Sequence, residues 1–181
     1  MRKLVCLVAA ALLFAAPAWA ADALPKGFYG SFSGTGLSET QPNGKVTKVK
    51  ARDFDVNIVP HGDGFTMTWN TTEYTIRPFN SSLEKDKAII NFLPTSRPGV
   101  FKTDLVADVT AGEPVYWAIL QGNTLMVYRL VTTEKGKFEI AVWTRTLIKG
   151  DKLQLEFHRY GTASPARVVK GTMSRVPDTQ R

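Results

Sequence analysis

The sequence predicts an all-β protein, a single antiparallel up-and-down β-barrel of about 8–10 strands. Short alternating runs rich in Val, Ile, Thr and aromatic residues recur along the chain, which is the pattern of half-buried strands. Turn pairs separate these runs at Asn43-Gly44, Gly62-Asp63, Pro98-Gly99, Gly122-Asn123, Lys135-Gly136 and Gly150-Asp151. Helical turns are expected only within 81–84, a capping-box pattern, and 104–110. With so little helix to cover its apolar face, a twisted sheet closes most simply on itself.

The first 20 residues have the three parts of a secretion signal. Arg2 and Lys3 supply the positive start, residues 4–16 are apolar, and residues 18–20 (Ala-Trp-Ala) form a cleavage site. The apolar run is shorter than the ~20 residues of a spanning helix, which favours cleavage over an uncleaved anchor. We therefore expect a signal peptide at 1–20, one β-barrel domain at 21–181, and a periplasmic or secreted protein.

Composition limits the chemistry of the exported chain. Of 181 residues 44% are apolar, which suits one globular core and argues against disorder. The one cysteine, Cys6, lies in the signal, so the exported chain has no disulfide and no thiol chemistry. Without Arg2 and Lys3, 21 basic residues face 16 acidic ones, a net charge of +5.

The first clear hairpin can be assigned residue by residue, because paired residues of an antiparallel hairpin share a face. A turn at 62–63 pairs Ile58 with Met67 and Val56 with Trp69. The opposite face then carries Asp53, Asp55, Asn57, Thr66, Thr68 and Asn70. One side of this hairpin is therefore apolar and the other is solvated.

Three later hairpins place the second half of the chain in the same way. The turn at 122–123 pairs Tyr116 with Arg129, and the turn at 135–136 pairs Val127 with Thr144. The last hairpin can turn at 150–151 or at 149–150, and both registers keep the same residues on the same face. One face then carries Leu120, Leu125, Val127, Val131, Phe138, Ile140, Val142, Leu153, Leu155 and Phe157. We expect this aliphatic face to be the interior, because burying one such side chain is worth ~1.5–3 kcal/mol.

Two arginines on the inner face form the candidate ligand site. Arg129 and Arg159 lie near Tyr116, and the inward Trp69 adds an aromatic wall. Two guanidiniums beside a tyrosine hydroxyl can hold a carboxylate or phosphate. The alternative is that both arginines lie at the barrel mouth, where they reach solvent or pair with local acids.

The outer face carries an aromatic row that is a candidate for docking a protein partner. Its members are Trp117, Tyr128, Trp143 and His158. Aromatic residues are favoured at the centres of interfaces, although cross-strand packing explains the same pattern. Arg145 beside Glu156 is expected to be a surface ion pair of little energetic value.

Several function classes are disfavoured. No H-x-x-x-H spacing, nucleophile elbow or phosphate-binding glycine loop occurs, so we expect no enzyme, no metal and no cofactor. Basic residues are scattered, which argues against nucleic acid and leaves weak attraction to anionic envelope surfaces. An outer-membrane barrel would turn Asp53, Asp55 and Asn57 toward lipid.

The meander resembles the calycin group, the lipocalin and fatty-acid-binding-protein barrels, and an exported bacterial envelope family. Gly27-Phe28-Tyr29 stands where lipocalins have Gly-x-Trp, with Tyr in place of Trp. The Arg-x-Tyr pair of fatty-acid-binding proteins is absent, and His158-Arg159-Tyr160 is the nearest arrangement. The resemblance implies a cavity for a small apolar or amphipathic molecule. We expect a monomer that binds a small lipophilic ligand, either neutral or anionic. The alternative is an interaction module, an inhibitor or envelope-assembly factor, that uses the aromatic row.

Overall fold

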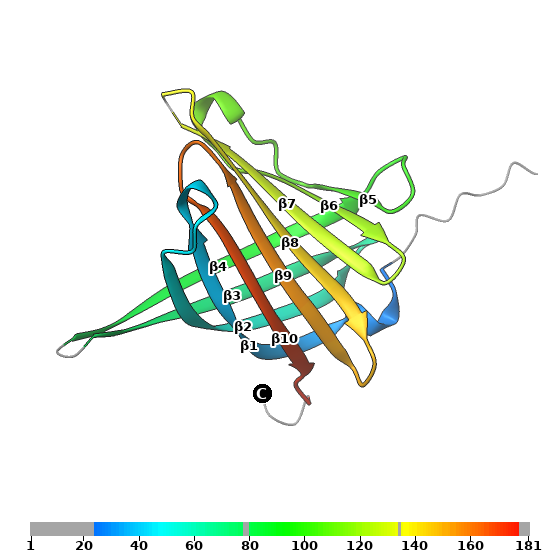
Figure 1. Cartoon of the computed structure of the whole chain (residues 1–181). Coiled ribbons are helices and arrows are strands. Elements are labelled where there is room, and N and C mark those ends of the chain that lie inside the picture. Colours follow the sequence, from blue (N-terminus) through cyan, green and yellow to red (C-terminus); the bar gives the residue numbers. More distant parts are fainter. Residues whose placement is uncertain (1–23, 78–79, 134, 178–181) are drawn as a thin grey trace, which may run out of the picture.

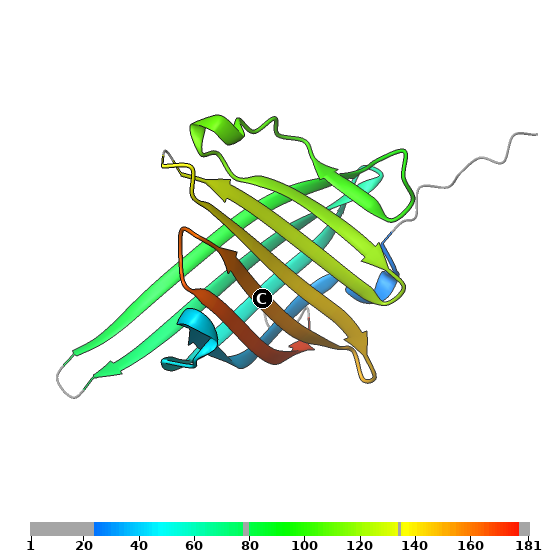
Figure 2. The same ribbon diagram turned by 45° about the horizontal axis from the view of Figure 1, so that its top comes forward.

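The protein is a closed barrel of ten antiparallel strands in up-and-down order, which confirms the expected fold class (Figure 1). The computed structural model describes residues 24–77, 80–133 and 135–177, without the side chains of 74–86, so the expected signal at 1–20 lies outside the described residues. The strands are β1 (Gly30–Gln41), β2 (Lys48–His61), β3 (Gly64–Arg77), β4 (Asn80–Pro94), β5 (Val100–Thr103), β6 (Val115–Gln121), β7 (Thr124–Thr132), β8 (Phe138–Ile148), β9 (Lys152–Gly161) and β10 (Ala166–Arg175). Each strand pairs with its sequence neighbours, and β1 pairs with β10 to close the barrel (Figure 2).

Over the described residues, helix is confined to three short 3₁₀ turns, η1 (Lys26–Phe28), η2 (Pro42–Gly44) and η3 (Val109–Ala111). η3 overlaps the expected segment 104–110 only at residues 109 and 110, and it is capped by Asp108, whose Oδ1 accepts a hydrogen bond from the backbone N–H of Thr110 at 2.8 Å. The helical turn expected at 81–84 is wrong, because these residues belong to β4 and pair with β3. The strand ladder satisfies the backbone groups that a capping box would otherwise serve.

One end of the barrel, the closed end, is filled by side chains. Phe65 stacks on Phe92 with ring centroids 5.0 Å apart and meets Phe101 edge-on at 5.1 Å. Phe28 of η1 is fully buried in the same core. Arg175 holds this segment in place, because its guanidinium donates to the carbonyl of Gly27 at 2.9 Å. In Figure 1, η1 is the short blue helix at the right-hand side of the barrel.

The seam between β1 and β10 depends on glycine. Gly36 lies opposite Gly171. A Cβ at Gly36 would lie 2.4 Å from the carbonyl oxygen of Lys170 and 2.9 Å from the ring of Phe54. Glycine therefore allows the two backbones and an inner ring to approach where the barrel closes.

The expected pairings of β2 with β3 and of β6 with β7 are confirmed, whereas those of β8 are wrong by one residue. Val127 lies opposite Trp143 rather than Thr144, because residues 133–137 form a loop of odd length. The loop between β8 and β9 also has an odd number of residues, so it shifts the register by one residue again. The two shifts cancel, and the residues of β9 lie on the faces expected for them. On β8 the inner face is therefore Glu139, Ala141, Trp143, Arg145 and Leu147. The outer face is Phe138, Ile140, Val142, Thr144 and Thr146.

Candidate functional site

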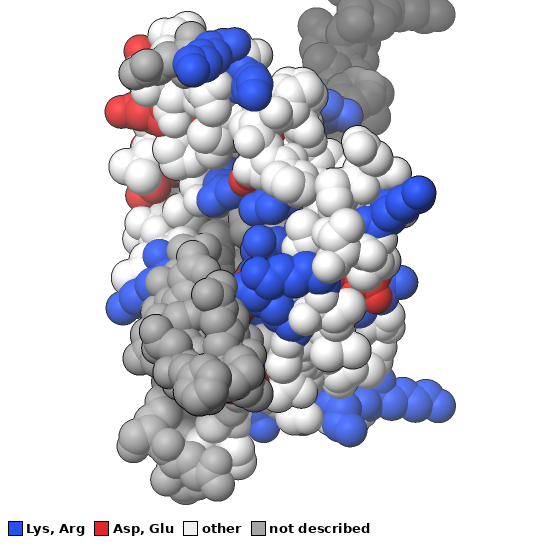
Figure 3. All heavy atoms as spheres, turned by 60° about the vertical axis from the view of Figure 1, so that its left-hand side comes forward, with Lys and Arg blue, Asp and Glu red and all other residues white. Residues whose placement is uncertain are grey.

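The end opposite η1, which we call the mouth, contains a cavity lined by arginines and aromatic side chains. β2, β8 and β10 begin at the mouth, and β3, β7 and β9 end there. The cavity is lined by Arg52, Phe54, Val56, Trp69, Asn70, Thr71, Arg129, Trp143, Arg145, Leu155, Phe157, Arg159, Arg167 and Val169. Figure 3 shows Lys and Arg side chains gathered around a hollow at this end.

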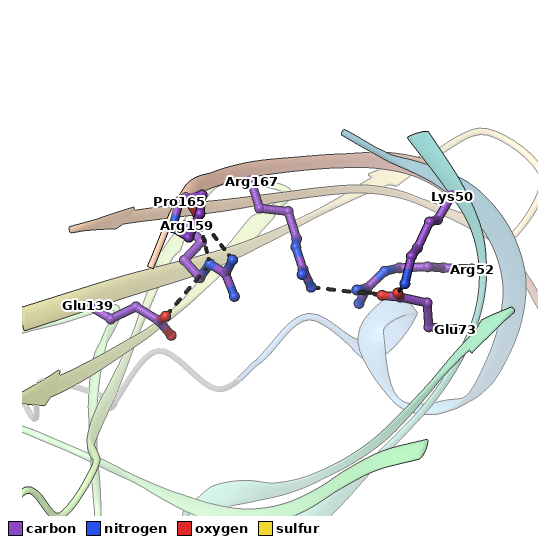
Figure 4. Close-up of polar contacts among 7 residues, drawn as sticks. All are labelled: Lys50, Arg52, Glu73, Glu139, Arg159, Pro165 and Arg167. Atoms are coloured by element: carbon purple, nitrogen blue, oxygen red, sulfur yellow. Dashed lines mark hydrogen bonds and ion pairs between the residues drawn. The ribbon is translucent and has the colours of Figure 1, made fainter. Parts of the chain in front are cut away.

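One side of the mouth is organised by a buried carboxylate. Glu73 on β3 is 4% exposed and forms ion pairs with Lys50 and Arg52 from the neighbouring strand β2. Arg52 lies directly opposite Glu73 in the β2–β3 register. Arg167 of β10 approaches the same carboxylate from across the mouth, with its Nη1 3.9 Å from Oε2 (Figure 4). We call these residues the Glu73 group.

The other side of the mouth is organised by Glu139 on β8. Its Oε1 accepts a hydrogen bond from Arg129 at 2.5 Å, and its Oε2 lies 3.6 Å from Nε of Arg159. Arg159 also donates to the carbonyl of Pro165 at 3.1 Å, which fixes the guanidinium at the rim (Figure 4). We call Arg129, Arg159 and Glu139 the Glu139 group.

The two groups bring like charges together. Burial and the neighbouring charge of Arg167 lower the pKa of Arg159, Glu139 opposes this shift, and Arg129 adds to it. Arg167 lies opposite Arg159 in the β9–β10 register, so strand pairing itself imposes the repulsion. An anion placed between these guanidiniums would relieve it.

Below the mouth, Arg145 is a buried cation with no acidic partner among the described side chains. It is 2% exposed, and its Nε and Nη1 atoms find no hydrogen-bond partner in that same set. Its guanidinium carbon lies 6.0 Å from the ring centroid of Trp69. Burial lowers the pKa of Arg145 to about 10, so the group still carries its charge at neutral pH. The expected surface pair with Glu156 is wrong, because Arg145 points into the barrel opposite Leu125 and Leu155.

Aromatic side chains form the cavity wall next to these arginines. Trp143 lies 5.5 Å from Trp69 and 5.1 Å from Phe157, measured between ring centroids. The guanidinium carbon of Arg129 lies 5.7 Å from the Trp143 ring, within the range of a cation–π contact. The wall therefore offers both apolar area and ring faces to a bound molecule.

Three of the four expected ligand residues line one cavity. Trp69, Arg129 and Arg159 do so, whereas Tyr116 packs edge-on against Trp69 at 6.2 Å, outside the lining set. Arg129 and Arg159 both lie at the mouth and both pair with Glu139. This is the alternative given in the sequence analysis, in which the two arginines pair with local acids at the barrel mouth.

The expected outer aromatic row is interrupted. Trp117 and Tyr128 stack across β6 and β7 with ring centroids 4.9 Å apart, and His158 stacks on Tyr160 at 5.7 Å. The placement of Trp143 in this row is wrong. The odd loop turns Trp143 inward, and Val142 takes its place opposite both Tyr128 and His158.

Sequence reasoning did not identify several side chains of the cavity. Arg145 and Trp143 were assigned to the wrong face, and Arg52, Arg167 and Glu73 were not singled out. The turn residues could not reveal the longer loops on either side of β8, because Gly136 and Gly150 have positive φ just as Gly62 and Gly122 do in the two-residue turns.

The described side chains of the cavity and its surroundings carry a net positive charge. Among the described side chains, six cations stand against the two carboxylates Glu73 and Glu139, a net charge of +4. The cations are Lys50, Arg52, Arg129, Arg145, Arg159 and Arg167. On the backbone, β4 sets Glu84 opposite Glu73 and Asp86 opposite Thr71.

No protein-family model and no curated protein matches the chain. In the described ranges, no group of three His, Cys, Asp or Glu side chains is placed to hold a metal ion. The helices described at 26–28, 42–44 and 109–111 include none with the length and apolar character of a membrane span.

Proposed function

We propose that this protein is an exported binding protein for a small amphipathic anion, held in the mouth of the barrel. The anionic group would contact guanidiniums, and the apolar part would lie against Trp69, Trp143 and Phe157. The exported location follows from the signal-like residues 1–20.

The observation that carries this proposal is Arg145. A buried charge without a partner is costly, and proteins retain such groups mainly where they have a role. Its Nε and Nη1 atoms, which have no hydrogen-bond partner among the described residues, lie beside a cavity that is also lined by four other arginines. A carboxylate or phosphate would supply the missing acceptors in bidentate geometry.

The size of the cavity limits the ligand. The cavity has a volume of about 100 Å³. One water needs about 10–15 Å³ of such space, and pockets for drug-sized ligands measure about 300–1,000 Å³. The cavity therefore suits a compact anionic head group with a short apolar part. Such a ligand is smaller than the range of lipophilic molecules that the calycin resemblance implies.

Isothermal titration calorimetry with sodium heptanoate and with neutral 1-heptanol tests the proposal. We expect the wild type to bind heptanoate and to bind heptanol at least tenfold more weakly, because only the anion satisfies the guanidiniums. Arg145→Met should weaken heptanoate binding at least tenfold. Arg97→Met is the matched control, since Arg97 is exposed in the turn before β5 at the far end. Equal affinity for heptanoate in the two variants would contradict the proposal.

A further inference from the structure

Counted over the described side chains, the mouth places more positive charge around one small cavity than a single carboxylate can balance. Glu73 and Glu139 each occupy one side of the mouth, and each is already bound by arginine. Arg159 and Arg167 belong to different groups yet lie directly opposite each other on β9 and β10. Arg145 adds a third guanidinium from below.

The arrangement also matches a tetrahedral head group. A carboxylate offers two oxygens in one plane, so it suits one or two guanidiniums in fork geometry. A phosphoryl group offers three terminal oxygens in different directions and carries up to two negative charges. The guanidiniums of Arg145, Arg159 and Arg167 come from three consecutive strands, β8, β9 and β10, and all line the same cavity.

Resting on the proposed function, we propose that the head group bound in the mouth is a phosphoryl dianion, contacted by Arg145, Arg159 and Arg167. Its two negative charges compensate the repulsion between Arg159 and Arg167. Its oxygens accept hydrogen bonds from Nε and Nη1 of Arg145, which have no partner among the described residues. The apolar part of a phosphate monoester lies against Trp69 and Trp143. Glu73 and Glu139 remain in their ion pairs with arginine and do not occupy the position of the bound phosphoryl group.

The test compares three probes of similar length by calorimetry at pH 8 and pH 5: hexyl phosphate, hexanesulfonate and heptanoate. Hexyl phosphate is largely a dianion at pH 8 and largely a monoanion at pH 5, since the second pKa of a phosphate monoester is about 6. The sulfonate is also tetrahedral but stays a monoanion throughout, so its pH profile reports any titration of the protein itself. The charged groups described around the site are Lys50, Arg52, Glu73, Arg129, Glu139, Arg145, Arg159 and Arg167.

We expect hexyl phosphate to bind at least tenfold more tightly than hexanesulfonate at pH 8, because the second charge meets several guanidiniums at short range. This preference should fall severalfold at pH 5. Equal affinities at pH 8, or an unchanged preference at pH 5, would overturn the phosphoryl assignment and leave the anion site standing. Failure of all three probes to bind would overturn both.

Two variants and one further probe complete the experiment. Arg159→Met should remove most of the preference for phosphate over sulfonate, and Arg145→Met, which we expect to fold stably, should reduce both affinities. An unchanged preference in Arg159→Met, or unchanged affinities in Arg145→Met, would overturn the assignment. Inorganic phosphate identifies the source of the group: affinity equal to that of hexyl phosphate indicates free phosphate, and weaker binding indicates an ester with an apolar part. Either result supports the phosphoryl class.

Discussion

Arg145 is the residue at which stability and binding oppose each other. Burial lowers the pKa of Arg145 to about 10, and at about 1.4 kcal/mol for each tenfold change in the protonation equilibrium the buried charge costs the empty protein roughly 3 kcal/mol. Arg145→Met should therefore raise the free energy of unfolding by about 2–3 kcal/mol while it weakens anion binding. Urea unfolding with and without hexyl phosphate measures both effects. A variant that is less stable without ligand would show that Arg145 already has a compensating partner.

Asp108 gives a pH dependence whose sign is fixed by its hydrogen bonds. The Thr110 hydroxyl and the backbone N–H groups of Thr110 and Ala111 lower the pKa of the Asp108 carboxyl below its ordinary 3.8. The folded pKa lies below the unfolded one, so the η3 cap is fully formed above the unfolded value and is lost as the pH falls through the folded value. An NMR titration of the Thr110 amide should have a midpoint below 3.8 that disappears in Asp108→Asn. A midpoint at or above 3.8 would contradict the cap.

At the scale of the element, the seam between β1 and β10 leaves no room for a side chain at Gly36. Gly36→Val would place a branched side chain against the Lys170 carbonyl and the Phe54 ring. We expect a loss of about 1–3 kcal/mol or more from overpacking. Thr35→Val, on the exposed face of the same strand, is the control and should change stability by less than about 0.5 kcal/mol. Thermal unfolding of the two variants by circular dichroism measures the difference, and similar midpoints would contradict the close approach.

The hairpins show how far sequence reasoning reaches at this scale. Two-residue turns at 62–63 and 122–123 set the registers of β2–β3 and β6–β7 correctly, because turn type and register are coupled. The same reasoning shifted β8 by one residue, and a one-residue shift exchanges the two faces of a strand. Trp143 and Arg145 were therefore placed outside. A strand with apolar residues on both faces, such as Ile140 and Val142 against Ala141 and Trp143, gives no hydrophobic pattern to correct the error.

At the scale of the whole molecule, the sequence predicted the closed barrel but not the ion pairs of its mouth. Closure follows from a continuous meander with one apolar face, which is encoded locally in every hairpin. The contact of Glu73 with Arg167 joins β3 to β10 and forms only once the barrel has closed. The contacts of Glu139 with Arg129 and Arg159 join neighbouring strands, but they depend on the register of β8, which the turn residues did not predict correctly.

Closure between the first and last strands also predicts slow folding. β1 and β10 pair across almost the full length of the described chain, and such non-local pairing is typical of proteins that fold in milliseconds to seconds. Stopped-flow refolding followed by tryptophan fluorescence should give its main phase in this range. Complete refolding faster than a millisecond would contradict a barrel that closes through this seam.

The most direct test of the account is side-chain NMR of the arginines in protein labelled with ¹⁵N-arginine. During a titration with hexyl phosphate, the Nε–Hε signals of Arg145, Arg159 and Arg167 should shift together and saturate at one affinity, while that of the exposed Arg97 stays in place. If the probe binds and these three signals remain unmoved, or if every arginine shifts slightly without saturation, the anion is not held in the mouth of the barrel.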